Sequence, residues 1–341
     1  MLSLISAPLL KQLFGLAAAA FWSILWLFSC SMLLVLFLLR WWPGDQLLIV
    51  RLVNYSMPWL LIILVPSLLA AGVADRKFLA VSLAVSTIFI AAAHAGLFFP
   101  KKPPVISASP TIKVMSYNVW SRNRDLSAAV KVVEQVKPDI LLVQELSPVN
   151  FEKISTSLSQ LFPPADGSVT YDAKTLLATF SRYPLVPLSM AIKGPVQKSI
   201  IQTPAGPVTV YNAHFLRTVL RHRSNWQRLT DQINSVISEE VARTTGPLIV
   251  GGDFNTTDQT ETYRLVSERL WNAHREAGYG FGFTFPAPSR KLKGRITLPP
   301  LVRIDHLFYN DKLVALGAGT LSDAGGSDHF PIFAEFVLTT P

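Results

Sequence analysis

The sequence has almost no cysteine. Cys30 is the only one among 341 residues. It lies in an N-terminal apolar stretch, so the region that follows contains no disulfide. The cysteine content therefore does not show whether this region lies in a reducing or an oxidising compartment.

Charged side chains are missing from three long stretches near the N-terminus. No Asp, Glu, Lys or Arg occurs between Lys11 and Arg40, between Arg51 and Asp75, or between Lys77 and Lys101. A hydrocarbon core about 30 Å thick needs ~20 helical residues. These stretches predict three transmembrane helices, near 13–39, 52–74 and 78–99. A cleaved signal peptide is a poor alternative, since the first apolar core is too long and no small-residue cleavage site follows.

The rest of the chain predicts a separate soluble domain. The Pro-containing segment 101–111 is typical of an extended linker, which divides a membrane domain (1–100) from a domain at 112–341. The net charge of +9 suits a phosphate-bearing substrate or an anionic bilayer. The part of this positive charge that lies in the second domain is too small for a dedicated nucleic-acid binder. Positive charges on the two sides of the spans nearly balance, so they do not determine the orientation.

Periodicity in the second domain predicts alternating strands and helices, the pattern of an α/β fold. The predicted strands lie near 112–118, 139–145, 175–181, 207–214, 247–253, 304–309 and 331–337. The predicted helices lie near 124–137, 150–160, 222–243 and 258–271. The alternation in 279–285 also predicts a core strand, with a Gly-rich aromatic tip that contacts lipid as the alternative.

Polar residues follow the predicted strands repeatedly. The apolar run 247–250 leads through two glycines to Asp253 and Asn255, two residues apart and so on one face of an extended chain. The other strands end in the same way, with Asn118, Glu145, His214, Asp305 and the pair Asp328-His329. One such end is ordinary, but this series predicts a single assembled site.

In order along the chain, these motifs resemble the endonuclease/exonuclease/phosphatase superfamily, the DNase I-like proteins. The segment Thr179–Pro184, with its Ser-Arg-Tyr-Pro element, adds to the resemblance, which covers roughly residues 111–338. It implies a two-sheet α/β sandwich, preceded here by the three-helix transmembrane region. It also implies hydrolysis of phosphate esters with the site at one end of the sandwich.

Such hydrolysis needs a hard divalent cation, donors for the phosphoryl group and a base for water. Glu145 and Asp328 are the best candidate metal ligands for Mg²⁺, or alternatively Mn²⁺. Asn118 would coordinate the ion or contact the substrate. The resemblance implies the same roles, with His214 and Asn255 on the phosphoryl oxygens.

Two residues compete for the role of general base. His329 would act as the base or as a phosphate clamp, and the resemblance implies that Asp305 accepts its second N–H. Asp253 is the rival base, and the sequence does not decide between them. His306 and Tyr211 adjoin the motifs on the opposite face and are predicted to be structural. The basic stretches that begin at Arg217 and Arg290 are either solvated faces or a rim that contacts phosphate or anionic lipid.

The sequence thus predicts a membrane-anchored, Mg²⁺-dependent phosphoesterase that acts on a phosphomonoester, a phosphodiester or a lipid pyrophosphate. One alternative is a membrane-tethered nuclease. The other is a non-catalytic scaffold, and the intact motif residues argue against it. The architecture resembles three-span phosphatases linked to glycopeptide (teicoplanin) resistance in actinomycetes. That resemblance implies a multi-pass protein of the bacterial plasma membrane with an extracytoplasmic catalytic domain and a lipid-borne substrate. No protein partner is evident.

Overall fold

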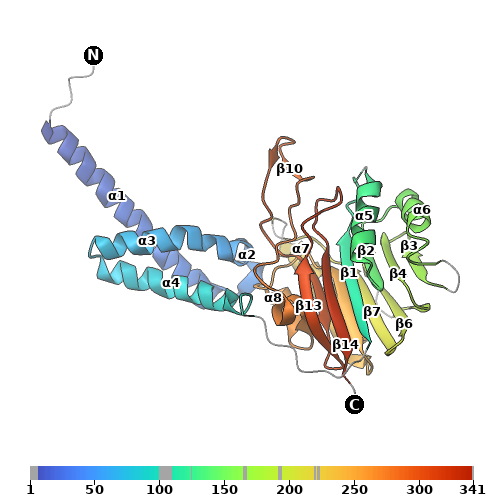
Figure 1. Cartoon of the computed structure of the whole chain (residues 1–341). Coiled ribbons are helices and arrows are strands. Elements are labelled where there is room, and N and C mark those ends of the chain that lie inside the picture. The colour runs from blue at the N-terminus through green and yellow to red at the C-terminus, as the bar shows by residue number, and fades with distance from the viewer. Residues whose placement is uncertain are drawn as a thin grey trace. The chain divides into compact units, whose positions relative to one another are not determined.

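The structure is a computed structural model that describes residues 7–99, 110–123, 125–163, 167–190, 194–218, 220 and 223–339. It divides into two compact units, Met1–Ala95 and Gly96–Pro341, which are described separately (Figure 1). Of the predicted linker 101–111, only the last two residues lie within the described ranges.

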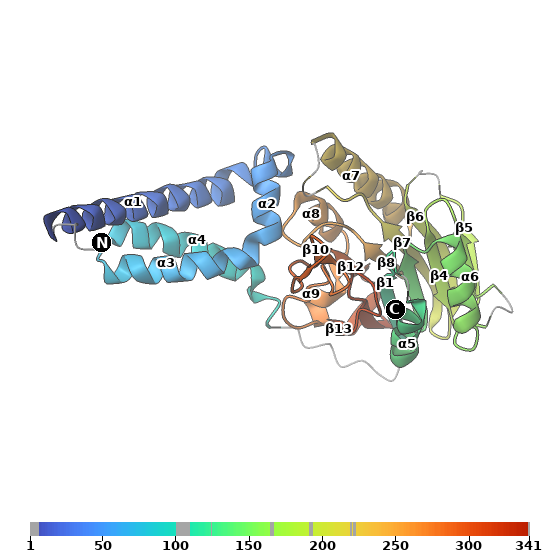
Figure 2. The same ribbon diagram turned by 90° about the horizontal axis from the view of Figure 1, so that it is seen from above.

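The first unit is entirely helical. Its elements are α1 (Ala7–Leu34), η1 (Val35–Leu39), η2 (Gly44–Gln46), α2 (Leu48–Ser56), η3 (Met57–Leu60), α3 (Leu61–Val73) and α4 (Lys77–Ala95). Three helices are long and apolar enough to cross a membrane: Pro8–Leu39, Leu48–Val73 and Lys77–Ala95. Helix α4 packs against both α1 and α3 (Figure 2). The second span contains the 3-10 turn η3 with Pro58 at its start, as expected where proline removes a helical N–H donor.

The burial pattern of this unit suits a lipid environment. Large apolar side chains such as Leu27, Phe78 and Ile88 are exposed, which in water would be unfavourable. The polar side chains are instead buried: Asn54 donates to Asp45 Oδ1 (2.7 Å), and Arg51 donates to the Asp45 carbonyl (2.7 Å). These helices suggest membrane association.

The second unit consists of two six-stranded mixed sheets, which confirms the predicted α/β sandwich. One sheet has the order β13 (Leu313–Thr320), β14 (Ile332–Leu338), β1 (Thr111–Asn118), β2 (Ile140–Gln144), β4 (Leu177–Ser181), β3 (Val169–Asp172). The other has the order β5 (Leu185–Leu188), β6 (Val196–Thr203), β7 (Gly206–His214), β8 (Leu248–Asp253), β12 (Asp305–Tyr309), β9 (Trp271–Asn272). At the centre of each sheet is one parallel pair, β1 with β2 and β7 with β8.

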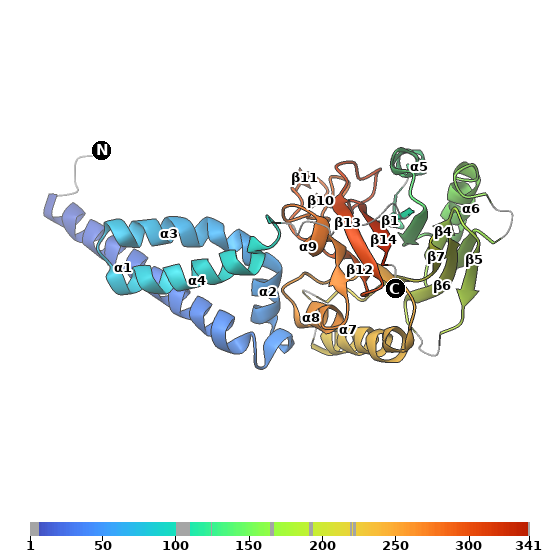
Figure 3. The same cartoon turned by 60° about the horizontal axis from the view of Figure 1, so that its bottom comes forward.

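Helices cover the outer faces of both sheets (Figure 3). Helices α5 (Leu126–Val136) and α6 (Pro148–Ser157) pack on the first sheet, whereas α7 (Arg223–Ser235) and α8 (Glu261–Ser267) pack on the second. The inner faces meet in one apolar core that includes Ile112, Leu142, Val210 and Ile249. The remaining elements are η4 (Val236–Glu240), η5 (Val241–Arg243), α9 (Ala273–Ala277), β10 (Lys291–Leu292) and β11 (Ile296–Thr297). Because parallel strands of each sheet end at the same edge, their last residues converge there.

The structure corrects several details. Residues 279–285 form an irregular loop with a single bridge, Phe285 to Val302, and not the predicted strand. Positive φ angles at Gly280 and Gly282 explain the difference, because extended strands require negative φ. The predicted helix at 258–271 is confined to α8. Strands β3, β5, β6 and β13 were missed, as were the two-residue strands β9, β10 and β11.

The residues directly after α4 belong to the second unit. The predicted third span ends at Ala95 and not at residue 99. Leu97 is buried and its carbonyl accepts a hydrogen bond from Gly280 N (2.7 Å). The Phe98 ring lies edge-on to Tyr279 and Phe281, at 5.9 and 5.1 Å between centroids. The second folded unit thus begins near Gly96, before the predicted linker.

Candidate active site

The polar strand ends converge at one edge of the sandwich. Asn118 ends β1, Glu145 follows β2, and His214 and Asp253 are paired ends of β7 and β8. Asp305, the first residue of β12, pairs with Asp253 across an antiparallel ladder. The loop before β14 adds Asp328 and His329.

Gly252 makes this convergence possible. Its φ is +144°, and a Cβ on it would lie 1.8 Å from the Ala213 carbonyl oxygen. No side chain fits at that distance, so only glycine lets β8 approach β7 closely enough to pair His214 with Asp253.

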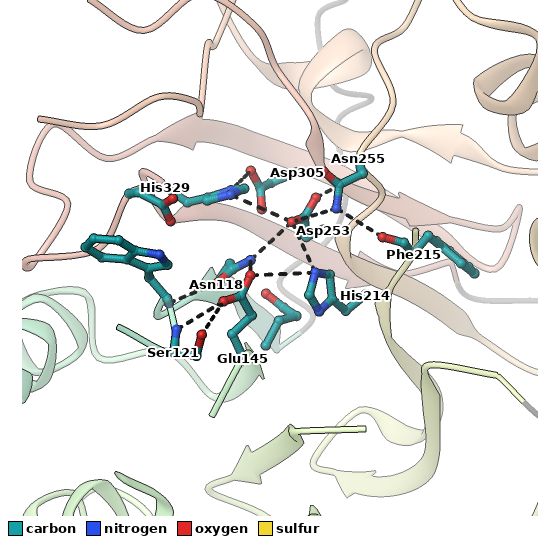
Figure 4. Close-up of polar contacts among 12 residues, drawn as sticks. Asn118, Ser121, Glu145, His214, Phe215, Asp253, Asn255, Asp305 and His329 are labelled. Atoms are coloured by element: carbon teal, nitrogen blue, oxygen red, sulfur yellow. Dashed lines mark hydrogen bonds and ion pairs between the residues drawn. The ribbon is translucent and has the colours of Figure 1, made fainter. Parts of the chain in front are cut away.

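Asp253 lies at the centre of the site (Figure 4). Its Oδ2 accepts hydrogen bonds from Asn118 Nδ2 (3.1 Å) and Asn255 Nδ2 (3.2 Å), and Oδ1 accepts one from Asn255 N (2.8 Å). The Nε2 atoms of His214 and His329 lie 3.7 and 3.8 Å from Oδ2. Burial and the neighbouring Asp305 carboxylate raise the pKa of Asp253 to about 6. The group is therefore mostly ionised near neutral pH but much more basic than an exposed carboxylate.

His329 is paired with Asp305 as the resemblance implied. Its Nδ1 lies 2.9 Å from Asp305 Oδ2, and both residues are buried. Burial alone would lower the pKa of His329, but the carboxylates of Asp305 and Asp253 outweigh it and raise the pKa to about 10. The imidazole is consequently protonated at neutral pH, which suits a cationic phosphate clamp better than a general base.

Glu145 is held by its neighbours in a strained backbone conformation. Its φ is +57°, uncommon for a residue with a side chain. Oε2 accepts from Ser121 N and Oγ (3.0 Å each), and Oε1 accepts from Asn118 Nδ2 (3.2 Å). Burial opposes ionisation, but the Ser121 N–H bond and the nearby His214 keep the pKa of Glu145 below its usual value. The side chain is thus fixed as a carboxylate.

Comparison with known proteins agrees with this arrangement. Residues 115–329 match the model of the "Endonuclease/Exonuclease/phosphatase family". The chain belongs to this family. Its members are metal-dependent hydrolases of phosphate esters.

Solved structures of low sequence identity share the fold. A family protein from Bacteroides thetaiotaomicron has a TM-score of 0.51 at 17% identity, with 69% of this chain and 100% of that chain covered. A family protein from Bacteroides vulgatus has a TM-score of 0.50 at 17% identity, with 67% and 100% covered. The structure of SmcL has a TM-score of 0.50 at 13% identity, with 67% and 99% covered. No curated protein matches the chain significantly.

The side chains present fit the divalent ion that the family requires. Glu145 and Asp328 both line one pocket. Among the described residues, Asp328 Oδ1 is buried without a hydrogen-bond partner, and it is a hard oxygen of the kind such ions prefer. Asn118 is less available than predicted, because its Oδ1 accepts from Trp120 N (2.9 Å) and its Nδ2 donates to two carboxylates.

A second acidic group also has metal-binding geometry. Ligand atoms of Asp253, Asp305 and His329 lie within 4.8 Å of one another. Within this group Asp305 Oδ2 and His329 Nδ1 already contact each other at 2.9 Å. Glu145 and Asp328 line the pocket and stay the predicted metal ligands.

A pocket of about 510 Å³ opens onto these residues. Its wall includes the aromatic rings of Trp120 and Phe285 and three arginines, Arg122, Arg217 and Arg290. Its volume is in the range typical of small-molecule sites.

Several supporting residues were missed from the sequence. Ser121 fixes Glu145, and Thr284 Oγ1 accepts from the backbone N–H groups of Ile304 (3.1 Å) and Asp305 (3.4 Å). Below the site, Gln144 donates to Asn212 (2.7 Å) between the two sheets. Only Asn212 had a detectable signal, because it precedes His214 by two residues and therefore shares its face.

His306 and Tyr211 have the structural surroundings that the sequence suggested. Tyr211 bonds Thr244 (3.1 Å), and buried His306 bonds the Thr256 carbonyl through Nε2 (2.8 Å). Burial and then Arg303 lower the pKa of His306 to about 4. It is thus neutral in the folded domain near pH 7.

This neutral histidine predicts a pH-dependent stability. The unfolded chain gains a proton at His306 below about pH 6.5 while the folded one does not, so stability is lost as pH falls from 6.5 towards 4. Between pH 7 and 5 the loss should be about 2 kcal/mol, or about 4–8 °C in thermal midpoint. Melting of wild type and His306→Gln at both pH values measures it. Equal pH shifts in the two proteins would contradict a neutral, buried His306.

Proposed function

We propose that this protein is a membrane-anchored, Mg²⁺-dependent phosphoesterase that cleaves a compact phosphate ester by attack of water. The observation that carries the proposal is the set of four donors around Asp253 Oδ2, at 3.1–3.8 Å. A basic carboxylate thus lies next to cationic or amide donors, and transfer of a phosphoryl group to water requires both kinds of group. Mn²⁺ is the alternative ion.

In the proposed reaction Asp253 accepts the proton of the attacking water, because its raised pKa makes it the strongest available base. The His329 imidazolium, oriented by Asp305, and the imidazole of His214 stabilise the charge on the phosphoryl oxygens. Asn255 Nδ2 donates to the Phe215 carbonyl (3.0 Å) and to Asp253 Oδ2 (3.2 Å), so Asn255 positions the base. Asn118 orients Asp253 and Glu145 through its amide group. A divalent ion held by Glu145 and Asp328 would supply further positive charge to those oxygens.

The three candidate spans make a membrane-borne substrate the natural target. Tethering raises the local concentration of enzyme at the bilayer. An odd number of spans would place the catalytic domain on the opposite side from the N-terminus, and we propose the outer face of a bacterial plasma membrane. The pocket volume of about 510 Å³ favours a compact phosphate group over nucleic acid. Hydrolysis rates on lipid pyrophosphates, phospholipids, inositol phosphates and DNA, each with Mg²⁺, test whether membrane-borne phosphates are preferred over nucleic acid.

A truncation tests the role of the spans. A protein of residues 96–341 keeps the Leu97 and Phe98 contacts, so its activity on a soluble phosphate ester should stay within about threefold of the full chain. On substrate embedded in vesicles it should fall at least about tenfold, because the tether is lost. Initial rates of both proteins on both substrates, at equal Mg²⁺, give the comparison.

A shorter protein that starts at residue 107 is the control. It lacks Leu97 and Phe98 and should melt at lower temperature. Equal rates of the 96–341 protein and the full chain on vesicles would remove the case for a membrane-borne substrate.

A further inference from the structure

Three arginines surround the mouth of the active-site pocket and are not used in the proposed reaction. We name Arg122, Arg217 and Arg290 the arginine rim. They come from distant segments: Arg122 follows β1, Arg217 follows β7, and Arg290 directly precedes β10. All three line the pocket that contains Glu145, Asp253 and His329.

Arg217 is fixed beside the reaction centre without being neutralised. Its guanidinium carbon lies 5.0 Å from the centroid of the Phe285 ring. That ring lies 4.9 Å from the His329 ring. Within the described part of the chain Arg217 forms no ion pair. A cation stacked on an aromatic face keeps its N–H donors available to an anion in the pocket.

Arg290 is held on the wall beside Asp328. Its NH1 lies 3.2 Å from Asp328 Oδ2. The backbone is fixed as well, because Arg290 N donates to the Ala287 carbonyl (2.9 Å) and Ala287 N donates to the Asp328 carbonyl (2.8 Å). The Arg290 side chain is nonetheless 45% exposed, so it remains accessible to an anion in the pocket.

Donors for one phosphoryl group are already present deeper in the site. The imidazoles of His214 and His329 lie beside Asp253, whereas the rim adds up to three guanidinium groups around the opening. Guanidinium groups bind phosphate oxygens in a bidentate manner. One phosphoryl group does not need both sets.

We propose that Arg217 and Arg290 bind a second phosphate of the substrate, next to the phosphoryl group that is cleaved. The inference rests on the proposed function and narrows its substrate to diphosphate esters or esters with a neighbouring phosphate. Arg122 completes the rim on the side of Trp120.

Ligand binding tests the rim independently of turnover. The full chain in detergent, with excess Mg²⁺, is titrated calorimetrically with methylenediphosphonate and with methylphosphonate. Wild type should bind the diphosphonate at least about tenfold more tightly, the scale of one charge-assisted contact. Arg217→Gln and Arg290→Gln should each lose about tenfold for the diphosphonate and less than about twofold for methylphosphonate.

Arg269→Gln is the matched control, since this exposed arginine lies outside the pocket and its loss removes the same charge. Arg290→Gln also breaks the contact with Asp328, so Arg217→Gln decides the result. Unchanged binding of both ligands in Arg217→Gln would overturn the proposal. Equal losses for both ligands would also overturn it, because Arg217 would then serve the cleaved group. Equal losses in Arg269→Gln would show general electrostatic attraction only.

Kinetics separate this proposal from the proposed function. A short-chain alkyl diphosphate and the corresponding alkyl monophosphate are compared by orthophosphate release. A selective rise of KM for the diphosphate in Arg217→Gln supports the rim. If both substrates are hydrolysed and Arg217→Gln shows no selective rise of KM for the diphosphate, the role proposed for the arginine rim is refuted. The proposed phosphoesterase activity then still stands. No Mg²⁺-dependent hydrolysis of either refutes the proposed function, while the calorimetric comparison still decides the rim.

Discussion

Replacing Glu145 with glutamine is expected to lower turnover at least about 100-fold. The side chain is held as a carboxylate by Ser121 and Asn118 on the pocket wall that it shares with Asp328. Glutamine keeps the size but removes the negative charge, which is what a hard divalent ion binds. The Mg²⁺ concentration for half-maximal rate should rise in parallel.

The measurement is the rate on a soluble phosphate ester as Mg²⁺ is varied, with EDTA as the zero point. Glu152→Gln, the same change at an exposed position of α6, is the matched control and should behave as wild type. Thermal midpoints within a few degrees would show that both variants fold. Full activity in excess EDTA, or a wild-type rate in Glu145→Gln, would falsify the metal assignment.

Removing the imidazole of His329 is expected to lower kcat/KM by about 1000-fold, the scale of a strong electrostatic contact to the transition state. Asp305 contacts that imidazole at 2.9 Å, and its carboxylate also raises the pKa of Asp253. Asp305→Asn should therefore cost less once His329 is alanine than it costs in the wild type, because its contact with the imidazole is then already gone. The four rates of the double-mutant cycle test this. Losses that multiply independently would show that Asp305 serves another group.

The pH profile gives a readout that misfolding would not imitate. Together with Asp253, Asp305 holds the pKa of His329 near 10 against the effect of burial. Because its pKa is raised, His329 stays protonated as the pH increases and loses its proton only when the pH passes that value. Asp305→Asn should therefore shift the alkaline decline of kcat/KM to lower pH. An unchanged alkaline limb would mean that the charge on His329 is not the active form.

The local pattern was sufficient to predict the α/β class and the existence of the site, whereas the two-sheet sandwich was implied by the resemblance to the family. Apolar runs of strand length ending in Asn118, Glu145, His214 and Asp253 predicted buried strands with polar ends. Because the carboxyl ends of neighbouring parallel strands share an edge, convergence followed from the pattern alone. The helices of the membrane unit were similarly predictable, since long uncharged runs have few other stable structures.

Strands without an alternating or apolar signature were not recovered. The strand β13 contains three alanine or glycine residues in succession, and β5 contains a proline and is only four residues long. Both are edge strands, where pairing with one neighbour is enough. The loop at 279–285 was wrongly predicted as a strand, because its aromatic residues alternate while its glycines adopt positive φ.

The chemical groups and the edge at which they meet could be predicted from the order of residues along the chain. The role of each group followed only from the fold, because a pKa depends on neighbours that are far away in the chain. Asp253 becomes more basic through burial and through Asp305, and His329 becomes a cation through two carboxylates from other strands. The arginine rim has the same origin: Arg217 and Arg290 are 73 positions apart in the sequence, and only the fold brings them to one pocket.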